Sequence, residues 1–150
     1  MPSVKDLMTK EVIMIDMHQT VFDSAVLMNG KIVGSLVIMD GEEPVGIVTE
    51  RDFVRRVIAK NLPFDTVLSE IMSKPLTTMD PDSPLRVAAR LMLKNKVRRL
   101  PVVKAAKLVG IIGASDFARQ LSKKTITEQI LEAMARYPVS VMDETMGVVG

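Results

Sequence analysis

The sequence predicts a mixed fold of the α/β kind (α+β), made of two β-α-β-β-α repeats packed about a pseudo-twofold axis. The main observation is an internal repeat. Residues 4–53 align without a gap on a later part of the chain when Met8 is placed on Met72. Each copy also has a helix-period apolar stripe followed by two short apolar runs, which is typical of a helix leading into a hairpin. A unit of about 60 residues buries too little surface to be secure alone, so we expect the copies to pack face to face.

This shift of 64 residues, from Met8 to Met72, is called the repeat offset below and holds along both copies. The matched residues are Met8 and Met72, Lys10 and Lys74, Asp16 and Asp80, Ala25 and Ala89, Leu27 and Leu91, Met28 and Met92, Val33 and Val97, Leu36 and Leu100, Val45-Gly46-Ile47 and Val109-Gly110-Ile111, and Asp52-Phe53 and Asp116-Phe117. We therefore expect repeat 1 over residues 1–63, repeat 2 over residues 64–124, and a C-terminal helix and tail over residues 125–150.

Local patterns give the elements of repeat 1. Val21, Ala25 and Met28 stand at i, i+4 and i+7, which predicts one helical face. Asp40-Gly41-Glu42-Glu43 between two apolar runs is a hairpin signal. In order, we expect a helical turn around residues 4–8, an extended piece at 12–15, a helix over about 20–29, strands at 35–39 and 45–48, and a helix over about 50–60.

Repeat 2 has the same order of elements. Its first long helix is expected to start with Ser83 as the cap and Pro84 at the first helical position. The apolar stripe of that helix consists of Leu85, Ala88, Ala89 and Met92. We expect its strands at residues 100–103 and 108–112, and its closing helix at 114–121.

The tail lies outside both copies. An apolar stripe (Ile126, Ile130 and Met134) and a capping box before it predict a helix over about 126–136. Residues 130–143 also match the opening of repeat 2 at nearly the same offset, so we interpret them as a possible partial third repeat. Such a copy could be a vestige, a swapped strand or the start of a longer protein, and an ordinary C-terminal helix at a dimer interface is the alternative.

Several kinds of chemistry lack their residues in this chain. There is no cysteine, and therefore no disulfide, thiolate nucleophile or cysteine metal site. The one histidine, His18, stands in an expected loop, where it suits a solvated residue better than a catalytic base or metal ligand. No Gly-rich phosphate loop of the Walker type is present. We expect no enzyme activity, no metal and no cofactor.

The formal net charge of +2 hides an asymmetry. Residues 1–75 carry 8 basic and 11 acidic side chains, a net charge of −3, whereas residues 76–150 carry 12 and 7, a net charge of +5. No acid stands between Asp82 and Asp116, and such a basic interval suits a polyanion or a phosphorylated small molecule. We do not expect nucleic acid as the partner, because the interval has no aromatic residue to stack on bases.

The chain shows no pattern for a membrane. Its N-terminus lacks the charged and then apolar sequence of a signal peptide, and no apolar run approaches the ~20 residues of a span. We therefore expect a cytoplasmic protein without membrane association.

The stretch from Gly46 to Phe53 is expected to form a buried strand that runs into a helix, with Gly46 allowing another backbone or a ligand to come close. Thr49 is a good N-cap, and Asp52 can complete a capping box. A strand end before a helix also suits a nucleotide phosphate or ribose, so both roles stay open. Repeat 2 has Gly113 instead of Thr49 but keeps Asp116, which we therefore do not attribute to a capping box.

These features resemble a tandem pair of CBS domains (a Bateman module) of the small stand-alone type. The resemblance rests on the order of elements and on three phrases, which are Gly34-Ser35-Leu36-Val37, Arg98-Arg99-Leu100-Pro101-Val102-Val103, and Gly46 with Thr49-Glu50-Arg51-Asp52. It covers roughly residues 4–122. The resemblance implies a non-catalytic sensor that binds adenosine-containing ligands in two clefts between the repeats and commonly forms a dimer.

The resemblance also implies roles in binding a nucleoside. Thr49 and Asp52 would hold the ribose, because a carboxylate can accept hydrogen bonds from both ribose hydroxyls. Asp116 would do the same in a reduced version of the motif. Backbone near Val12 and Leu76 would read the edge of adenine.

For phosphate, the resemblance points to Arg98 and Arg99, whose planar forks can each bond two oxygens. The equivalent residues of repeat 1 are Gly34 and Ser35, which offer backbone amides and a hydroxyl but no charge. The arginines could serve either cleft, and we expect the two clefts to be unequal. The alternative for the two arginines is a solvated edge strand that charge protects from aggregation.

We expect a regulatory module that binds AMP, ADP or ATP, forms a homodimer and acts on a protein that the sequence does not identify. Two alternatives stay open. The ligand could be of the S-adenosylmethionine type, or the chain could be a constitutive dimerisation scaffold with empty clefts.

Overall fold

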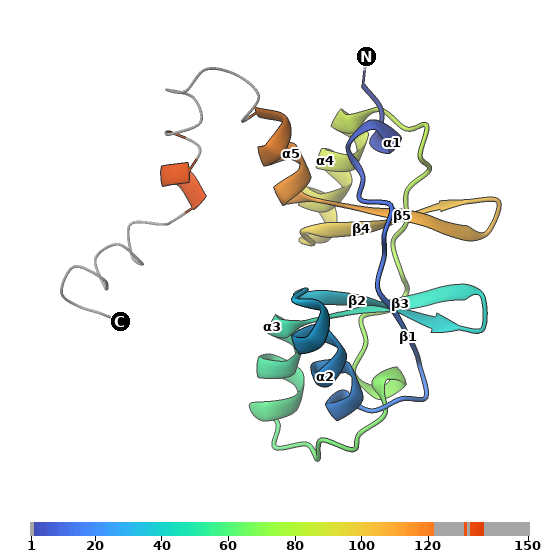
Figure 1. Cartoon of the computed structure of the whole chain (residues 1–150), viewed down its shortest axis with the longest axis vertical. Coiled ribbons are helices and arrows are strands. Elements are labelled where there is room, and N and C mark those ends of the chain that lie inside the picture. The colour runs from blue at the N-terminus through green and yellow to red at the C-terminus, as the bar shows by residue number, and fades with distance from the viewer. Residues whose placement is uncertain (1, 122–130, 132, 137–150) are drawn as a thin grey trace. The chain divides into compact units, whose positions relative to one another are not determined.

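A computed structural model describes residues 2–121, 131 and 133–136 (Figure 1). The chain divides into two compact units, Met1–Ile112 and Gly113–Gly150. The elements are α1 (Val4–Leu7), β1 (Met14–Asp16), α2 (Val21–Lys31), β2 (Ser35–Asp40), β3 (Glu43–Thr49), α3 (Glu50–Asp52), the π-helix η1 (Phe53–Ile58), the 3-10 helix η2 (Leu68–Glu70), α4 (Leu85–Asn95), β4 (Arg99–Lys104), β5 (Lys107–Gly113) and α5 (Ala114–Leu121). Leu131 and residues 133–136 are helical, and the rest of the expected tail helix and of the proposed third repeat lies outside the described residues.

Each repeat builds its own sheet. In repeat 1, β2 lies between β1, to which it is parallel, and β3, to which it is antiparallel. In repeat 2, β4 pairs with β5, and the counterpart of β1 is a single parallel bridge between Met79 and Val102. This bridge is the Ile15–Ile38 pair of repeat 1 displaced by the repeat offset on both strands. The predicted mixed fold of two repeats is confirmed.

The core of repeat 1 lies between its sheet and its helices. Figure 1 shows α2 and the helix that begins with α3 on the same face of the β2–β3 hairpin. The buried residues of this core are Ile15, Val21, Met28, Leu36, Ile38, Val48 and Val57 of repeat 1, joined by Leu68, Ile71 and Met72 from the opening of repeat 2. The predicted stripe of α2 is therefore confirmed at Val21 and Met28, whereas Ala25 is exposed.

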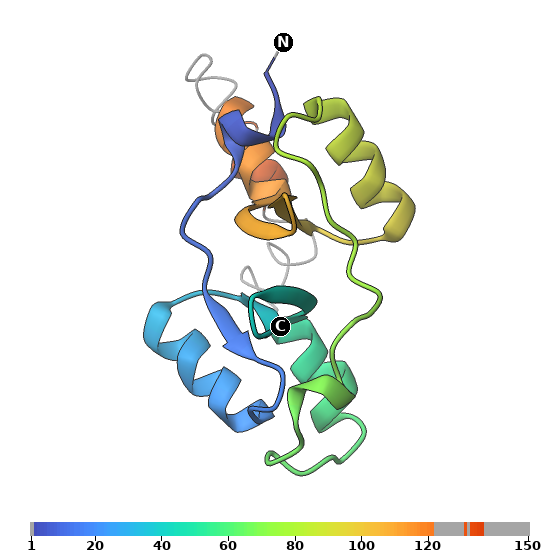
Figure 2. The ribbon, with the colours of Figure 1, turned by 90° about the vertical axis from the view of Figure 1, so that its right-hand side faces the viewer.

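The opening segment of each repeat packs against the other repeat. The isolated bridges are Thr9–Ile111 and its counterpart Ser73–Ile47, and Ser3–Pro84 and its counterpart Val67–Thr20. Every pair is related to its counterpart by the repeat offset. Figure 2 shows the two connecting segments on opposite sides of the hairpins, running in opposite directions. This reciprocal exchange is the pseudo-twofold relation that the internal repeat predicts.

Two glycines permit this exchange. A Cβ on Gly46 would lie 2.6 Å from Sδ of Met72, which belongs to the opening of repeat 2. A Cβ on Gly110 would lie 2.6 Å from Sδ of Met8, which belongs to the opening of repeat 1. Such an approach requires a residue without a side chain. We expected another backbone or a ligand beside Gly46, and the nearest atoms are instead those of a methionine side chain.

One local prediction is wrong, and two other elements differ in their bounds or helix type. Ser83 does not cap α4, because Pro84 occupies the N-cap and no side chain bonds to the helix end there. The carbonyl of Ser83 accepts a hydrogen bond from the Val4 N–H at 2.9 Å, which holds its backbone in the exchange between repeats. β1 begins at Met14, later than expected, and the helix expected over 50–60 is a short α3 followed by a π-helix that ends at Ile58.

Candidate functional site

Four of the predicted residues gather at one edge of the repeat 1 sheet, where β2 begins and β3 ends. Ser35 is the cross-strand partner of Thr49. The Glu50 N–H donates to the Gly34 carbonyl at 3.1 Å, which ties the start of α3 to the start of β2. Asp52 follows on the first turn of α3. The structure thus brings together Gly34, Ser35, Thr49 and Asp52.

Thr49 and Asp52 form the predicted capping box. The Thr49 N–H donates to Asp52 Oδ2 at 2.9 Å, and the Asp52 N–H donates to Thr49 Oγ1 at 3.3 Å. The Asp52 side chain is 14% exposed, and its Oδ1 lies 3.5 Å from Nε of Arg56. Because an ionised carboxylate has about four acceptor positions, lone pairs remain on Asp52 for a ligand hydroxyl. The structural role is confirmed, and it leaves room for the ligand-binding one.

The second unit repeats half of this arrangement at the start of α5. The Gly113 N–H donates to Asp116 Oδ2 at 2.7 Å, and Asp116 also pairs with Arg119. Asp116 is only 5% exposed. Our expectation that Asp116 owes nothing to a capping box is therefore wrong, because glycine keeps the backbone donor of the box and loses only the side-chain acceptor.

Repeat 2 brings a cation to the edge of repeat 1. Nη2 of Arg99 lies 3.7 Å, and Oε1 of Glu50 3.5 Å, from the position that a Cβ of Gly34 would take. A guanidinium and a carboxylate therefore flank Gly34 from two repeats. Gly34 and Ser35 carry no charge themselves, but Gly34 lies beside one charged side chain from each repeat.

The other predicted residues are less closely tied to this edge. Arg98 is exposed just before β4, and Val12 and Leu76 are half-buried at equivalent positions outside the strands. Among the residues that the structure describes, no hydrogen bond or ion pair joins these three to the cluster around Gly34. Their roles stay predictions.

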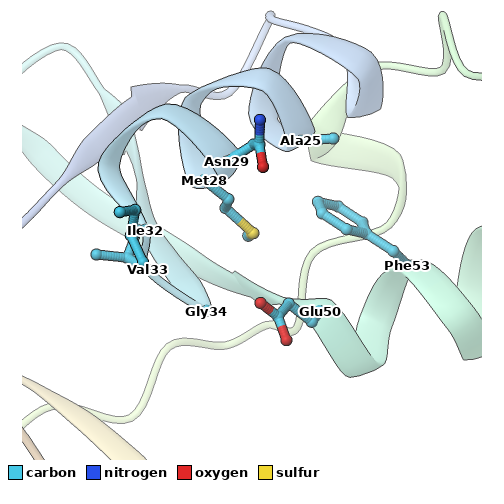
Figure 3. A pocket seen from close by; sticks show the side chains of 8 residues that line it. All are labelled: Ala25, Met28, Asn29, Ile32, Val33, Gly34, Glu50 and Phe53. Carbon is cyan, nitrogen blue, oxygen red and sulfur yellow. The ribbon is translucent and has the colours of Figure 1, made fainter.

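A pocket of about 410 Å³ opens between α2 and η1 and shares Gly34 with this edge (Figure 3). Its lining consists of Ala25, Met28, Asn29, Ile32, Val33, Gly34, Glu50 and Phe53. Figure 3 shows Met28 and Phe53 pointing into it from opposite helices, with Glu50 at its edge. This volume suits a small ligand. Sequence reasoning missed Glu50 and Phe53, although Glu50 lies within the predicted capping box and Phe53 directly follows it.

The lone histidine and the acidic side chains make no further site in the described part of the chain. His18 is 73% exposed in its side chain, and its Nδ1 lies 3.0 Å from Asp16 Oδ1. Within residues 2–121, 131 and 133–136, no group of three His, Cys, Asp or Glu side chains could hold a metal ion. None of the helices in that same part is long and apolar enough to cross a membrane.

Known proteins of one family resemble this chain. The sequence profile of the CBS domain matches residues 4–59 and 68–123. The CBS domain-containing protein YhcV of Bacillus subtilis is 36% identical over 126 residues, which are 83% of this chain and 90% of YhcV. The crystal structure of an uncharacterized conserved protein from Pyrococcus horikoshii is similar with a TM-score of 0.75 and 31% identity, covering 83% of this chain and 94% of that one.

A second solved structure was determined with ligands. The CBS domain pair of protein MJ0100, in complex with 5'-methylthioadenosine and S-adenosyl-L-methionine, has a TM-score of 0.75 and 27% identity to this chain. The match covers 83% of this chain and 98% of that pair. With two family matches separated by the repeat offset and the reciprocal packing of the repeats, this chain belongs to the CBS domain family as a tandem pair of CBS domains.

Proposed function

We propose that this chain is a non-catalytic sensor that binds an adenosine nucleotide (AMP, ADP or ATP) in clefts between its repeats. Its family consists of regulatory ligand-binding modules, which generally lack catalysis. The observation that carries the proposal is the arrangement around Gly34, where Thr49 and Asp52 of repeat 1 lie at the same sheet edge as Arg99 of repeat 2.

The ribose is assigned to Asp52. Its Oδ2 is occupied by the capping box, whereas its Oδ1 faces Arg56 at a distance longer than a good hydrogen bond. A ribose hydroxyl that donates to Oδ1 would form a charge-assisted hydrogen bond with a carboxylate that the box already holds in place. Binding therefore requires little reordering of Asp52.

Phosphate is assigned to Arg99, with Arg98 next to it on the exposed chain. A guanidinium can bond two phosphate oxygens at once, and the absence of a side chain on Gly34 leaves space beside it. Because Arg99 comes from repeat 2, a nucleotide bound here would contact both repeats. Ligand binding would then shift the packing of the repeats, and a regulated protein would respond to that change.

A ligand of the S-adenosylmethionine type is a second candidate. The observation in its favour is Glu50, whose carboxylate lies near Gly34 and at the edge of an apolar pocket. A carboxylate repels phosphate but attracts the amino and sulfonium groups of such a ligand. The ligands of the MJ0100 pair are of this class.

Calorimetric titration with AMP, ADP, ATP, adenosine and S-adenosylmethionine tests the proposal. Asp52→Asn should weaken the binding of every adenosine ligand by about 1.5–3 kcal/mol, since a hydrogen bond to a charged group is lost. Asp23→Asn is the matched control, because Thr20 and Asp23 form the same capping box at α2 away from the cluster around Gly34. Equal affinities in the two variants would remove the ribose assignment.

Arg99→Ala separates the two ligand classes. This substitution should weaken the binding of AMP and ATP much more than that of adenosine. It should weaken the binding of S-adenosylmethionine least. Equal losses for charged and uncharged ligands would show that Arg99 does not hold phosphate. A wild-type chain that binds none of these ligands would favour the scaffold with empty clefts.

We also propose a homodimer. The outer faces of α2 and η1 expose large apolar side chains, which are Phe22, Val26, Val54 and Ile58, each more than half exposed. Exposed apolar side chains gathered on one face are typical of an interaction surface. In sedimentation velocity experiments, Phe22→Ser with Val26→Ser should convert the wild-type dimer into a monomer. A wild-type chain that sediments as a monomer would contradict this part of the proposal.

A further inference from the structure

The outer face of α4 carries a basic stripe, which we define as Arg86, Arg90 and Lys94. These residues stand at i, i+4 and i+8 on an α-helix, so they follow one another along one side at steps of about 6 Å. All three are exposed. Val87 and Leu93 flank the stripe, and their side chains are 39% and 80% exposed. The face that α4 presents to solvent is thus cationic in the middle and aliphatic at its sides.

The equivalent helix of repeat 1 shows that the fold does not require these cations. At the repeat offset, the basic stripe corresponds to Phe22, Val26 and Gly30 of α2. Both helices bury the opposite face, through Met28 in α2 and through the equivalent Met92 in α4. A helix in this position therefore packs equally well without charge on its outer face.

The described part of the chain offers the basic stripe no ion-pair partner. Within the part of the chain that the structure describes, no ion pair involves Arg86, Arg90 or Lys94. Like charges at i and i+4 repel each other and slightly destabilise a helix. The stripe thus weakens α4 slightly with no compensation from the described residues, which points to a role outside the molecule.

We propose that the basic stripe of α4 is a docking surface for an acidic segment of another protein, with carboxylates facing the three cations and an aliphatic side chain against Leu93. This inference goes beyond nucleotide binding and does not depend on it, because the stripe contains none of the residues assigned to the nucleotide. The partner is defined by charge complementarity together with the exposed aliphatic flanks.

A protein segment fits the stripe better than nucleic acid or a bilayer does. No aromatic residue stands between Asp82 and Asp116 to stack on bases. The net charge of −3 over residues 1–75 also works against a long polyanion, which needs a broad positive field. A bilayer would need the apolar face of the helix, and that face of α4 is buried through Ala88 and Met92.

The test uses the full chain and a defined probe, a fluorescein-labelled 18-residue helical peptide with glutamates at i, i+4 and i+8 and leucines beside them. In fluorescence anisotropy, the triple variant Arg86→Gln, Arg90→Gln and Lys94→Gln should bind it about tenfold more weakly, since each exposed ion pair contributes up to about 1 kcal/mol. The matched control is Lys31→Gln, Arg55→Gln and Lys60→Gln, which removes three exposed cations of repeat 1. It should change the affinity less than twofold. Leu93→Ser should weaken the binding of this peptide but not that of a polyglutamate of equal charge.

Four results would overturn the proposal. Equal losses in the two triple variants would show that the peptide senses only net charge. A single-stranded DNA of equal charge that bound the stripe more tightly than the peptide would assign it to nucleic acid. A change in the sedimentation coefficient of the triple variant would assign it to contacts between copies. For a readout without substitutions, the peptide should slow amide hydrogen exchange in α4 of the wild-type chain, and unchanged exchange there would also overturn the proposal.

Discussion

Repeat 1 and repeat 2 agree in what they bury and differ in what they expose. The bridges between the repeats recur at the repeat offset, as do the buried methionines of α2 and α4. At the hairpin tips, by contrast, Asp40-Gly41-Glu42-Glu43 of repeat 1 corresponds to Lys104-Ala105-Ala106-Lys107 of repeat 2. The buried positions thus follow the same pattern in both copies because they must pack in the same way. The exposed positions are under no such constraint and differ in charge. The sheet edge around Gly34 and the basic stripe of α4 both lie on surfaces where the copies differ.

The largest difference between the repeats should appear at the two glycines under the methionines. The three atoms nearest to a Cβ on Gly46 all belong to the side chain of Met72, whereas those nearest to a Cβ on Gly110 include the Thr9 carbonyl at 3.0 Å beside the Met8 side chain. Because a backbone atom cannot move aside as a side chain can, Gly110→Ala should cost about 3 kcal/mol and Gly46→Ala about 1–2 kcal/mol. Denaturant unfolding measures both free energies.

A second substitution separates steric overlap from other causes. Met72→Ala combined with Gly46→Ala should recover part of the loss caused by Gly46→Ala alone, because the clashing side chain is removed. Met8→Ala should recover less in the Gly110→Ala background, since the Thr9 carbonyl stays. If the two glycine variants lose equal stability, the two opening segments pack equally tightly on their glycines. The proposed difference between the repeats would then be wrong.

The next largest difference in stability is expected between substitutions at the N-terminus of α2 and at the N-terminus of α4. Thr20 caps α2 in a full capping box, whereas α4 starts at Pro84 with no side-chain cap. Thr20→Ala should lower the free energy of unfolding by about 1 kcal/mol. Ser83→Ala should change it by less than about 0.5 kcal/mol, as expected for a substitution away from caps and core. A loss at Ser83 as large as that at Thr20 would mean that Ser83 caps α4 after all.

At the hairpin tips, we expect smaller changes in stability, which have opposite signs in the two repeats. Gly41 has a φ of 63°, and Ala105 and Ala106 adopt φ values of 51° and 65°. Left-handed backbone is unfavourable for residues with a Cβ. Gly41→Ala should therefore destabilise the chain, and Ala105→Gly should stabilise it, each by about 0.5–1 kcal/mol. Melting temperatures that shift in the same direction for both variants would contradict this account.

These comparisons show which parts of the structure the sequence could predict. The internal repeat predicted the reciprocal packing, because a repeated apolar pattern must bury equivalent faces. The turn at Ala105 and Ala106 has none of the glycine or asparagine that marks such a turn, so only its flanking strands were predicted. Ser83 failed as a cap because its carbonyl is bonded to Val4, a contact between residues far apart in the sequence.

The candidate site was predictable to a similar extent. Thr49 and Asp52 could be identified because their capping box is local. The approach of Arg99 to Gly34 could not be assigned, since it depends on how one repeat lies against the other. Phe53 and Glu50 line a pocket whose other wall is α2, and no local pattern contains that information.

The smallest expected effect concerns a charge cluster found in repeat 2. Nζ of Lys5 and Nζ of Lys104 lie 2.9 and 2.8 Å from the Asp82 carboxylate, and their hydrogen bonds and charges lower the pKa of Asp82 to about 2. Lys5 belongs to the opening of repeat 1, so this cluster adds a link between the repeats. In repeat 1 the position of Asp82 is taken by His18, which bonds Asp16 within its own turn.

The sign of the pH dependence follows from the lowered pKa of Asp82. A carboxylate with a lower pKa in the folded chain stabilises it fully above the ordinary value of 3.8, and this contribution is lost as the pH falls through about 2. Asp82→Asn should therefore be less stable than the wild type at pH 6, and the two should converge between pH 4 and pH 2. Since all three side chains are more than half exposed, the difference at pH 6 should be small and should shrink further in concentrated salt. Glu42→Gln, at the tip of the repeat 1 hairpin, is the control and should show no such convergence. A difference between Asp82→Asn and the wild type that persists unchanged at pH 2 would mean that the Asp82 carboxylate is not the group that links the two repeats.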